Sequence, residues 1–340
     1  MNDLITIGIP IYNVEKYVEK ALLSALDQTY DNIEFIIVDD KGTDNSMNIV
    51  RSIIESHSRS KYVRIIEHDY NIGLGAGRNT AIESASGKYI YFMDSDDEIV
   101  LDCIKILYKK MQEEAVDFIT ASIDRRDRSG RLLVESIQKD RHITGSENIV
   151  SDYFINKNRR VSVWNKLYDV SFLRRNNIKC IPTHLNEDNL FTFQVILNAE
   201  SCKYISDITY HFFDTPDSIT KATDNNRLSQ KYAKQYTESI EFKRKYIQNY
   251  KDLINRECVF RYIIFQTIHY VTLIKKSNIL NRKEKREYIK KLTIFPLGIS
   301  DIKKFKNKRF FYIMYVIYSL PFTSYCFRFI KYISSFRQKK

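Results

Sequence analysis

Three carboxylates lie within four positions at the end of an apolar, aromatic run of the chain. The run covers residues 89–93 and is typical of a buried strand, and the acids are Asp94, Asp96 and Asp97. Clustered carboxylates at a strand end repel one another unless a cation offsets their charge. A divalent cation that also holds phosphates prefers one or two carboxylates over a full protein cage. The alternative is an acidic helix start, which the helix dipole favours without any metal.

Two further polar clusters follow apolar runs of strand type. Pro10 and Tyr12 close the run at residues 4–9, and Asp39 and Asp40 close the run at residues 33–38. In open α/β sheets, ligands bind beyond the carboxyl ends of the strands. Three polar clusters at such ends favour a ligand that carries phosphate and is held with a metal.

A glycine-dense segment at residues 71–77 opens a helix that carries Arg78. It does not fit the dinucleotide fingerprint G-x-G-x-x-G, because its third glycine comes one place early and it follows the third strand. The glycines more plausibly permit close backbone approach. Arg78 would then lie at a helix start, where it can meet a phosphate or base. The alternatives are a solvated helix residue and a salt bridge to one of the strand-end acids.

The elements that carry these residues alternate between strand and helix. Strands are expected at 4–9, 33–38, 63–67, 89–93 and 118–121, with helices at 14–28, 44–56, after the glycines and at 101–114. Such alternation predicts a mostly parallel, doubly wound sheet. A polar hairpin or loop is expected at 124–145, helices at 146–156 and 187–198, and an aromatic strand at 204–213.

Several residues beyond this region have both a structural and a functional interpretation. Glu187 and Asp188 lie in the first turn of a helix, where the dipole favours acids without any chemistry. Trp164 is the only tryptophan, and a core anchor is the preferred interpretation. His211 lies in the aromatic strand, where a lone histidine is more often structural.

The cysteine pattern and the apolar segments indicate the cellular compartment in which the protein is expected. The five cysteines are scattered without a C-x-x-C pair or zinc spacing, which is typical of reduced thiols in a cytosolic protein. The first residues lack the basic and apolar regions of a signal peptide. No apolar stretch reaches the roughly 18 residues expected of a spanning helix.

Charge is distributed unevenly. Residues 225–340 contain 27 Lys and Arg against 7 Asp and Glu, a net of +20, whereas residues 1–224 carry −8 of the total of +12. The apolar, aromatic run at 310–322 has basic residues on both sides, which suits a helix in a membrane interface. The alternative is a helical bundle that packs on the rest of the chain or forms a dimer contact. Nucleic acid fits less well, since no binding motif accompanies the charge.

Six motifs, in order, resemble glycosyltransferase family 2. They lie at residues 7–13, 38–46, 71–79, 94–97, 164–168 and 187–191, and the resemblance covers about residues 4–220. The last two look like the W-N-K-L-Y and E-D-x-x-F segments of bacterial surface-polysaccharide members. One departure concerns the aromatic strand, which in the family often ends in Arg and here ends at Phe213. Arg78, the metal or His211 would then have to serve the phosphates.

The resemblance implies a GT-A fold, an inverting mechanism and a nucleotide-diphosphate sugar donor, often a UDP-sugar. Asp188 would be the general base with Glu187 beside it, and Asp96 with Asp94 would hold Mn²⁺ or Mg²⁺. The donor would be bound by Pro10, Tyr12, Asn13, Asp39, Asp40, Asn71, Gly73, Arg78, Asp94 and Ser95. Contacts to acceptor or donor are expected from Asp97, Trp164, Lys166 and His211.

We therefore expect a GT-A, Rossmann-like catalytic domain at 1–224, with a nucleotide-sugar-binding half at 1–122 and an acceptor and base half at 123–224. A basic, aromatic, mainly helical region would follow at 225–340. The predicted function is metal-dependent transfer of a hexosyl or N-acetylhexosaminyl group to a growing bacterial surface glycan. The acceptor would be lipid-linked, and the enzyme cytoplasmic and peripheral on the inner face of the membrane.

Two other functions stay open at this point, as does self-association. A nucleotidyltransferase would also use a strand-end metal, but this chain lacks a Gly-rich loop with a phosphate-binding Lys after the first strand. A non-catalytic scaffold tethered through the basic tail would be favoured by loss of the acids, and Asp96 and Asp188 are both present.

Overall fold

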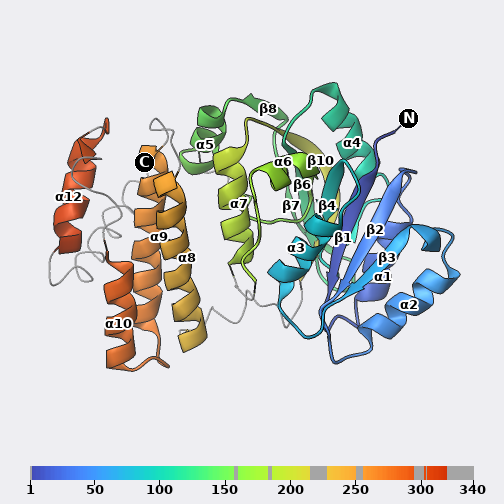
Figure 1. The fold of residues 1–340 in the computed structure, drawn as a ribbon, viewed down its shortest axis with the longest axis horizontal. Coiled ribbons are helices and arrows are strands. Elements are labelled where there is room, and N and C mark those ends of the chain that lie inside the picture. Colours follow the sequence, from blue (N-terminus) through green and yellow to red (C-terminus); the bar gives the residue numbers. More distant parts are fainter. Residues whose placement is uncertain are drawn as a thin grey trace. The chain divides into compact units, whose positions relative to one another are not determined.

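The computed structural model describes residues 2–156, 160–182, 186–214, 228–249, 256–294, 302–303 and 305–319. The chain divides into two compact units (Figure 1). The sheet unit comprises residues 1–149 and 159–216, and the helical unit comprises residues 150–158 and 217–340. Each unit has its own core, so each is described by itself.

Four parallel strands form one half of the sheet unit, in the order β3-β2-β1-β4. They are β1 (Ile5–Ile11), β2 (Ile33–Asp39), β3 (Val63–Glu67) and β4 (Tyr89–Phe92). Ile11 pairs with Asp39, so β1 and β2 end at the same edge. The three polar clusters that follow β1, β2 and β4 therefore share one edge, and the predicted doubly wound sheet is confirmed (Figure 1).

The other half of the sheet is mixed. β9 (Lys166–Asp169) lies antiparallel between β4 and β6 (Phe118–Arg126), and β10 (Ser201–Phe213) runs parallel to β6. A short β5 (Glu98–Ile99) pairs antiparallel with β10. β7 (Leu132–Ser136) forms a hairpin with β6, and β8 (Arg141–Thr144) pairs with β10. A polar hairpin was expected at 124–145, but β8 was not, because its partner lies about 60 residues away and its own pattern is polar.

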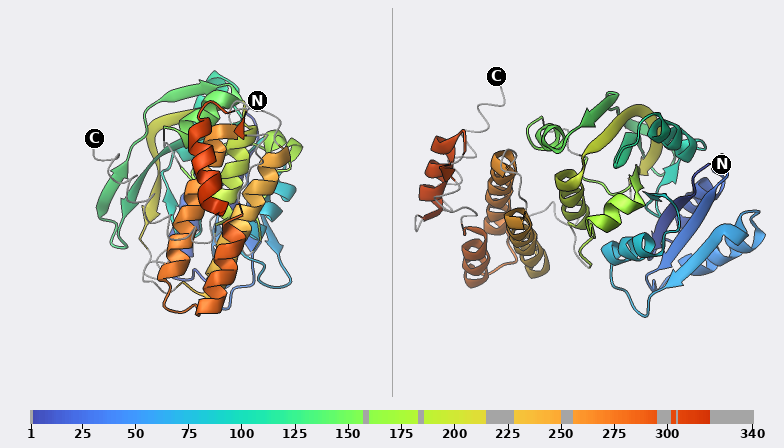
Figure 2. Two further views of the ribbon diagram at one scale, coloured as in Figure 1. Left: turned by 90° about the vertical axis from the view of Figure 1, so that its left-hand side faces the viewer. Right: turned by 45° about the horizontal axis from the view of Figure 1, so that its top comes forward.

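Helices cover both faces of the sheet (Figure 2). On one face, side chains of α1 (Val18–Leu26), α2 (Ser46–Ser56) and α4 (Cys103–Glu113) form one apolar core with alternate residues of β1, among them Ile7. The opposite face carries α3 (Leu74–Ser84), α6 (Val170–Arg175) and α7 (Glu187–Asn198). Gly8 allows α3 to approach β1, since a Cβ there would lie 2.9 Å from Cβ of Ala81.

Two helix starts differ from the sequence prediction. α1 begins at Val18 rather than residue 14, because residues 14–17 form a turn in which the N–H of Val14 donates to Oγ of Ser46 at 2.8 Å. α2 begins at Ser46 rather than at residue 44, with Asn45 in the N-cap position. Asp44 instead accepts hydrogen bonds from backbone N–H groups of Ser46 and Glu15. These bonds tie the start of α2 to the segment after β1.

The described part of the helical unit contains α8 (Gln230–Asn249), α9 (Arg256–Lys276), α10 (Arg282–Leu292), α12 (Lys308–Ser319) and the end of α5 (Ser146–Phe154). α8, α9 and α10 pack against one another, and Tyr236 stacks on Tyr270 with centroids 4.2 Å apart. Among the helices that the structure describes, none has both the length and the apolar character to cross a bilayer. The end of the predicted interfacial run and the terminal basic residues lie outside the described residues.

Candidate active site

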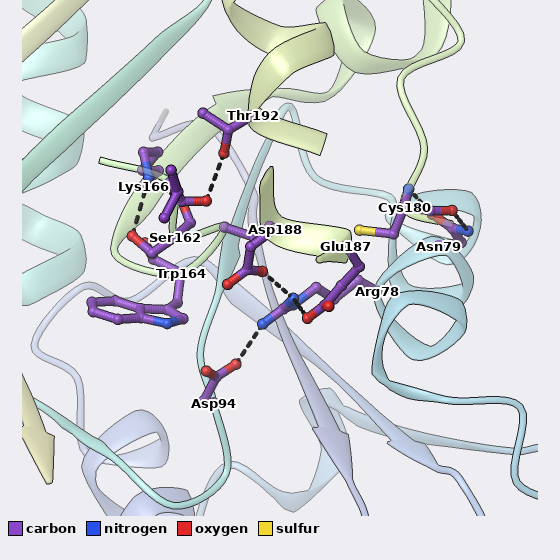
Figure 3. A network of polar contacts seen from close by, with 12 residues as sticks. Arg78, Asn79, Asp94, Ser162, Trp164, Lys166, Cys180, Glu187, Asp188 and Thr192 are labelled. Carbon is purple, nitrogen blue, oxygen red and sulfur yellow. Dashed lines mark hydrogen bonds and ion pairs between the residues drawn. The ribbon is translucent and has the colours of Figure 1, made fainter. Parts of the chain in front are cut away.

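Arg78 lies at the centre of a cluster of carboxylates (Figure 3). Its Nη2 donates to Oδ1 of Asp94 at 2.7 Å. Its Nη1 donates to Oδ1 of Asp188 at 2.6 Å and to Oε1 of Glu187 at 3.2 Å. The residue is only 1% exposed. One guanidinium thus joins the acid that follows β4 to the two acids that open α7, and the salt-bridge alternative for Arg78 is what the structure shows.

The start of α3 places Arg78 there. Gly73 has φ of 93°, a left-handed conformation that favours glycine. The carboxylate of Asp40 accepts hydrogen bonds from the N–H groups of Ile72 at 2.9 Å and Gly73 at 2.8 Å, which fixes the turn before the helix. Gly75 then lets α3 pass close to the chain after α6, because a Cβ there would lie 2.8 Å from the carbonyl oxygen of Ile181.

A reciprocal side-chain contact holds the same two segments together. Nδ2 of Asn79 donates to the carbonyl oxygen of Cys180 at 2.9 Å, and the N–H of Cys180 donates to Oδ1 of Asn79 at 2.8 Å (Figure 3). Asn79 follows Arg78 directly, so this pair fixes the first turns of α3 against the chain that leads toward α7.

Burial perturbs the acids around Arg78. It raises the pKa of Asp94 to about 6 and that of Glu187 to about 7; neighbouring carboxylates add to both effects and Arg78 opposes them. Burial alone would lower the pKa of Arg78, but Asp188, Asp94 and Glu187 outweigh it and raise that pKa well above the usual value. Arg78 is therefore a permanent cation. The side chain of Asp188 is 30% exposed against 10% for Glu187, so Asp188 is the more accessible to a substrate.

The acids after β4 have different surroundings. Asp97 is 1% exposed and accepts hydrogen bonds from the hydroxyl of Tyr210 and the N–H of Phe213, each at 2.8 Å. Burial raises the pKa of Asp97 well above its usual range. Through these contacts Asp97 supports the position of β10. Asp96 lies in the turn before β5, with its side chain 33% exposed, and meets the guanidinium of Arg128.

The residues present offer a metal an incomplete set of ligands, which a bound diphosphate would complete. Over the residues that the structure describes, no three His, Cys, Asp or Glu side chains converge closely enough to hold an ion. Asp94 and Asp96 offer two half-buried carboxylates. Mg²⁺ commonly uses one or two carboxylates together with substrate phosphates. The donor set is therefore suited to a metal bound with a diphosphate and not to a permanent structural metal.

The other residues predicted to bind the donor lie along the edge where β1, β2 and β4 end and α3 begins. Pro10 is buried at the end of β1, and a Cβ on Gly77 would lie 3.0 Å from its Cβ. Tyr12 is 46% exposed just beyond the strand. The others are Asn13, Asp39, Asp40, Asn71, Gly73 and Ser95, of which Asn71 is exposed and Asp39, Asp40 and Ser95 are buried.

Local hydrogen bonds engage several of these side chains. Asn13 has φ of 52° and its Oδ1 accepts from the N–H of Thr43 at 2.7 Å. Asp39 accepts from the N–H of Lys41 at 2.8 Å. Asp40, besides its two backbone donors, meets Nδ1 of His68 at 2.8 Å. These contacts shape the loops around the edge, while Tyr12 and Asn71 are the side chains most open to a ligand.

Trp164 lies in the loop that leads into β9, and Lys166 is the first residue of that strand. The indole lies flat on Tyr210, with centroids 4.4 Å apart and planes at 14°, and on Phe212 at 5.8 Å and 13°. Lys166 is 3% exposed and its Nζ donates to the carbonyl oxygen of Ser162 (Figure 3). Burial lowers the pKa of Lys166 to about 7, and the charge of Asp188 opposes that shift. Trp164 is thus half-buried on aromatic neighbours, as the core-anchor interpretation expects.

His211 is tied to another carboxylate. Its Nδ1 lies 2.8 Å from Oδ1 of Asp124 on the neighbouring strand β6. Two residues that sequence reasoning missed are Asn165 and Arg128. Asn165 has φ of 55°, and its buried side chain bonds Tyr91, Thr209 and the backbone of β6. Asn165 belongs to the W-N-K-L-Y segment, but that motif does not reveal what its side chain contacts, and Arg128 belongs to an arginine-rich hairpin that was interpreted only as a polar loop.

Similarity to solved structures defines the class of fold. The chain superposes with a TM-score of 0.66 and 20% identity on S. aureus TarS 1-349 in complex with UDP-GlcNAc, covering 99% of this chain and 92% of that one. A mannosyltransferase from Pyrobaculum calidifontis, in complex with GDP-Man and Mn²⁺, gives a TM-score of 0.52 at 12% identity, covering 93% and 87%. The predicted GT-A fold is confirmed.

Sequence similarity then identifies the family. The family described as Glycosyl transferase family 2 matches residues 6–181. The chain therefore belongs to glycosyltransferase family 2, and the resemblance seen in its motifs is confirmed.

Curated relatives indicate a glycosyltransferase as well. Glycosyltransferase GlyA of Streptococcus pneumoniae is 31% identical over 65% of this chain, and the match spans only 32% of GlyA. The uncharacterized glycosyltransferase EpsJ of Bacillus subtilis is 28% identical over 71% of this chain and 70% of its own length. A poly(ribitol-phosphate) beta-glucosyltransferase of Bacillus spizizenii is 32% identical over 61% of this chain and 32% of its own.

Proposed function

We propose that this protein transfers a hexosyl or N-acetylhexosaminyl group from a UDP-sugar to a hydroxyl group of a growing bacterial surface glycan, with inversion at the anomeric carbon. The observation that carries the proposal is the bridge that Arg78 makes between Asp94 and Asp188. Asp94 lies beside the predicted diphosphate site, and the guanidinium of Arg78 links it to the accessible carboxylate of Asp188. UDP-GlcNAc is the ligand named for TarS, and one relative is named a poly(ribitol-phosphate) beta-glucosyltransferase, which supports this choice of donor and of a bacterial surface polymer as acceptor.

Asp188 is proposed as the general base. In a single displacement, the acceptor oxygen attacks the anomeric carbon, its proton passes to Asp188, and the bond from that carbon to the diphosphate oxygen breaks. The nucleoside diphosphate leaves with the bonding electrons. Arg78 holds the carboxylate of Asp188 in place through a charge-assisted hydrogen bond. A positioned base typically contributes about 10²–10⁴ in rate.

Asp96 and Asp94 are proposed to hold Mn²⁺ or Mg²⁺ together with the donor diphosphate. When bound, the metal would offset the negative charge that develops on the leaving diphosphate. Asp94 stays linked to Arg78, so the donor side and the base share one charge network. Because Arg78 is almost completely buried among its three carboxylates, its own role here is to position them.

A donor-binding experiment tests the proposal. Purified protein with Mn²⁺ is titrated with a panel of nucleotide sugars, and released nucleoside diphosphate is measured with and without acceptor sugars. We expect one donor to bind and to be hydrolysed slowly, and we expect Asp96→Ala to abolish this effect. If no donor binds to the folded protein in the presence of Mn²⁺, the transferase proposal is wrong and a non-catalytic scaffold is favoured.

An anionic membrane surface is the proposed partner of the helical unit, which would place the enzyme at the inner face of the cell membrane near a lipid-linked acceptor. The supporting observation is α12, where Tyr312, Ile313 and Val316 are 37%, 59% and 56% exposed. These residues share one face of the helix, which begins with Lys308 and Arg309. An exposed apolar face with basic residues at its end suits an interface that is apolar and negatively charged.

A further inference from the structure

Arg128 lies beside the predicted metal ligand Asp96. Its Nη1 donates to the carbonyl oxygen of Asp96 at 2.8 Å, and its Nη2 lies 3.5 Å from Oδ2 of the same residue. The guanidinium carbon is 3.8 Å from the ring centroid of Tyr17 and 5.3 Å from that of Phe213. The arginine is thus held by two aromatic rings and faces the carboxylate that the family motif assigns to the metal.

The turn that carries Arg128 is well ordered by its own hydrogen bonds. Oδ1 of Asp127 accepts from the N–H groups of Ser129 at 3.0 Å and Arg131 at 3.1 Å, and Gly130 closes the turn by donating to the carbonyl of Asp127 at 2.9 Å. Because this turn joins β6 to β7, Arg128 reaches Asp96 from the hairpin that these two strands form. Its side chain is 25% exposed and that of Asp96 is 33% exposed. Both groups can therefore meet a ligand from solution.

The other cations and imidazoles considered for the phosphates are engaged elsewhere. Arg78 is buried on three carboxylates, Lys166 donates to Ser162, and His211 meets Asp124. At the end of β10, Phe213 presents a ring to Arg128 and contributes no charge of its own. A cation beside Asp96 is therefore supplied by the β6–β7 hairpin and not by β10.

The contact between Arg128 and the Asp96 carboxylate is weak by its geometry. At 3.5 Å between partly exposed groups, it resembles the surface ion pairs that add little stability. Phosphate oxygens accept two parallel hydrogen bonds from a guanidinium, which is a stronger and better-directed contact. The guanidinium carbon is 3.8 Å from the ring centroid of Tyr17, so Arg128 can keep this ring contact while it exchanges its hydrogen bond to the Asp96 carbonyl for one to a phosphate.

We propose that Arg128 exchanges partners when the donor binds. It neutralises Asp96 in the free enzyme, and it moves onto the donor diphosphate when the carboxylate of Asp96 takes up the divalent cation. This inference rests on the proposed function and names the residue that replaces the arginine missing at Phe213. Loss of Arg128 should therefore change the affinities for the metal and for the diphosphate in opposite directions, because Arg128 competes with the metal for Asp96 but binds the diphosphate.

Calorimetric titration of the full chain with Mn²⁺ alone, and then with UDP in saturating Mn²⁺, tests the exchange. For Arg128→Gln we expect tighter binding of Mn²⁺ alone and at least about tenfold weaker binding of UDP, since a hydrogen bond to a charged group is lost. Arg131→Gln is the matched control. It removes the same charge from the same hairpin, but its side chain is 75% exposed and pairs with Asp127, so both affinities should match the wild type.

Each outcome separates this inference from the proposed function. If Arg128→Gln binds UDP as well as the wild type, the exchange is wrong while UDP binding stands. If UDP binding weakens but Mn²⁺ binding does not tighten, Arg128 contacts phosphate without competing for Asp96, and the exchange is again wrong. If the wild type itself binds no UDP, the proposed function fails and this inference with it. If the circular dichroism spectrum shows that Arg128→Gln is not folded, Arg128→Lys is measured instead. We then expect weakened UDP binding, because a lysine cannot form the bidentate contact.

Discussion

Asp188 is held at one oxygen by Arg78 and has a side chain 30% exposed, which leaves the carboxylate open to an acceptor hydroxyl. Glu187 lies next to it but is 10% exposed, and burial raises its pKa to about 7. The same guanidinium contacts both acids, so their difference arises from exposure. A base must reach its substrate, and this favours Asp188 over Glu187.

Replacing Asp188 by Asn should reduce sugar transfer by about 10²–10⁴, the usual contribution of a positioned base. The amide can still accept a hydrogen bond from Arg78, so UDP affinity should change little. The measurement is turnover with the donor found in the panel, together with calorimetric binding of UDP. Asp207→Asn, an exposed residue of β10, is the control. Full turnover in the Asp188 variant would show that another group takes the proton.

At the scale of elements, the approach of α3 to its neighbours depends on small residues. A Cβ on Gly75 would lie 2.8 Å from the carbonyl oxygen of Ile181, which leaves no room for it, and a Cβ on Gly77 would make a tight contact of 3.0 Å with Pro10. Because Arg78 follows within the same helical turn, a shift of α3 moves the guanidinium away from the carboxylates after β4 and at α7. The packing of α3 and the charge network are therefore linked.

Gly75→Ala should lower the free energy of unfolding by about 1–3 kcal/mol, the usual effect of overpacking. It should also weaken UDP binding, because the displaced helix carries Arg78. Denaturant unfolding and UDP titration measure the two effects. Ser84→Ala, at the far end of α3, is the control and should change neither. Unchanged stability and UDP affinity in Gly75→Ala would mean that the segment at Ile181 gives way without cost.

The helical unit contains a cation of its own between α8 and α9. Lys243 is fully buried, and its Nζ donates to Oε1 of Gln266 at 2.7 Å. Burial lowers its pKa from 10.5 to about 7. Between these two values the unfolded chain binds more protons than the folded one at this site, so its contribution to the unfolding free energy rises with pH over that window. Below about pH 7 both states carry the proton, and the full cost of burying the charge is present.

Comparison of the wild type with Lys243→Met at pH 7, 8 and 9 isolates this effect, since all other titrating groups are shared. The wild type should gain stability relative to the variant as the pH rises. Urea unfolding followed by far-ultraviolet circular dichroism gives the two free energies. Parallel pH dependences for the two proteins would show that Lys243 is not titrated in this range.

At the scale of the whole chain, charge is separated along the sequence. Residues 225–340 carry +20, and residues 1–224 carry −8. A strongly basic region attracts anionic surfaces and is screened by salt. With the exposed apolar face of α12, this separation is the basis of the proposed membrane contact.

Sedimentation with lipid vesicles tests that contact on the full chain. Binding should be clear with vesicles that contain phosphatidylglycerol, weak with phosphatidylcholine alone and reduced by salt. The double substitution Ile313→Gln with Val316→Gln should lower partitioning by about tenfold or more, since each side chain loses part of its apolar burial. The matched control is Leu132→Gln with Val134→Gln, which makes the same kind of change at β7 residues that are 49% and 56% exposed. Equal sedimentation of the two double variants would reject α12 as the membrane face, and self-association measured by light scattering would identify it as a contact between copies.

The order of elements and motifs along the chain determined much of this protein. Alternating apolar runs and helical patterns predicted the doubly wound sheet, and polar residues at the ends of β1, β2 and β4 predicted the edge at which a ligand is expected. These features are local, since periodicity reports which face of an element is buried and parallel strands bring their ends to one edge. The motifs identified the family for the same reason, because each is a short run of adjacent residues.

Only the tertiary structure decided which of these acids lie together. Arg78 reaches Asp188 across 110 positions of the sequence, and no local pattern shows that contact. Asp96 and Asp97 are adjacent and chemically identical. Asp97 is nevertheless buried and hydrogen-bonded to β10, whereas Asp96 stays accessible. The hairpin after β6 likewise brings Arg128 to the site, while the other arginines of that hairpin pair elsewhere. Strand order and side-chain burial set these distances, and both arise from contacts between segments far apart in the chain.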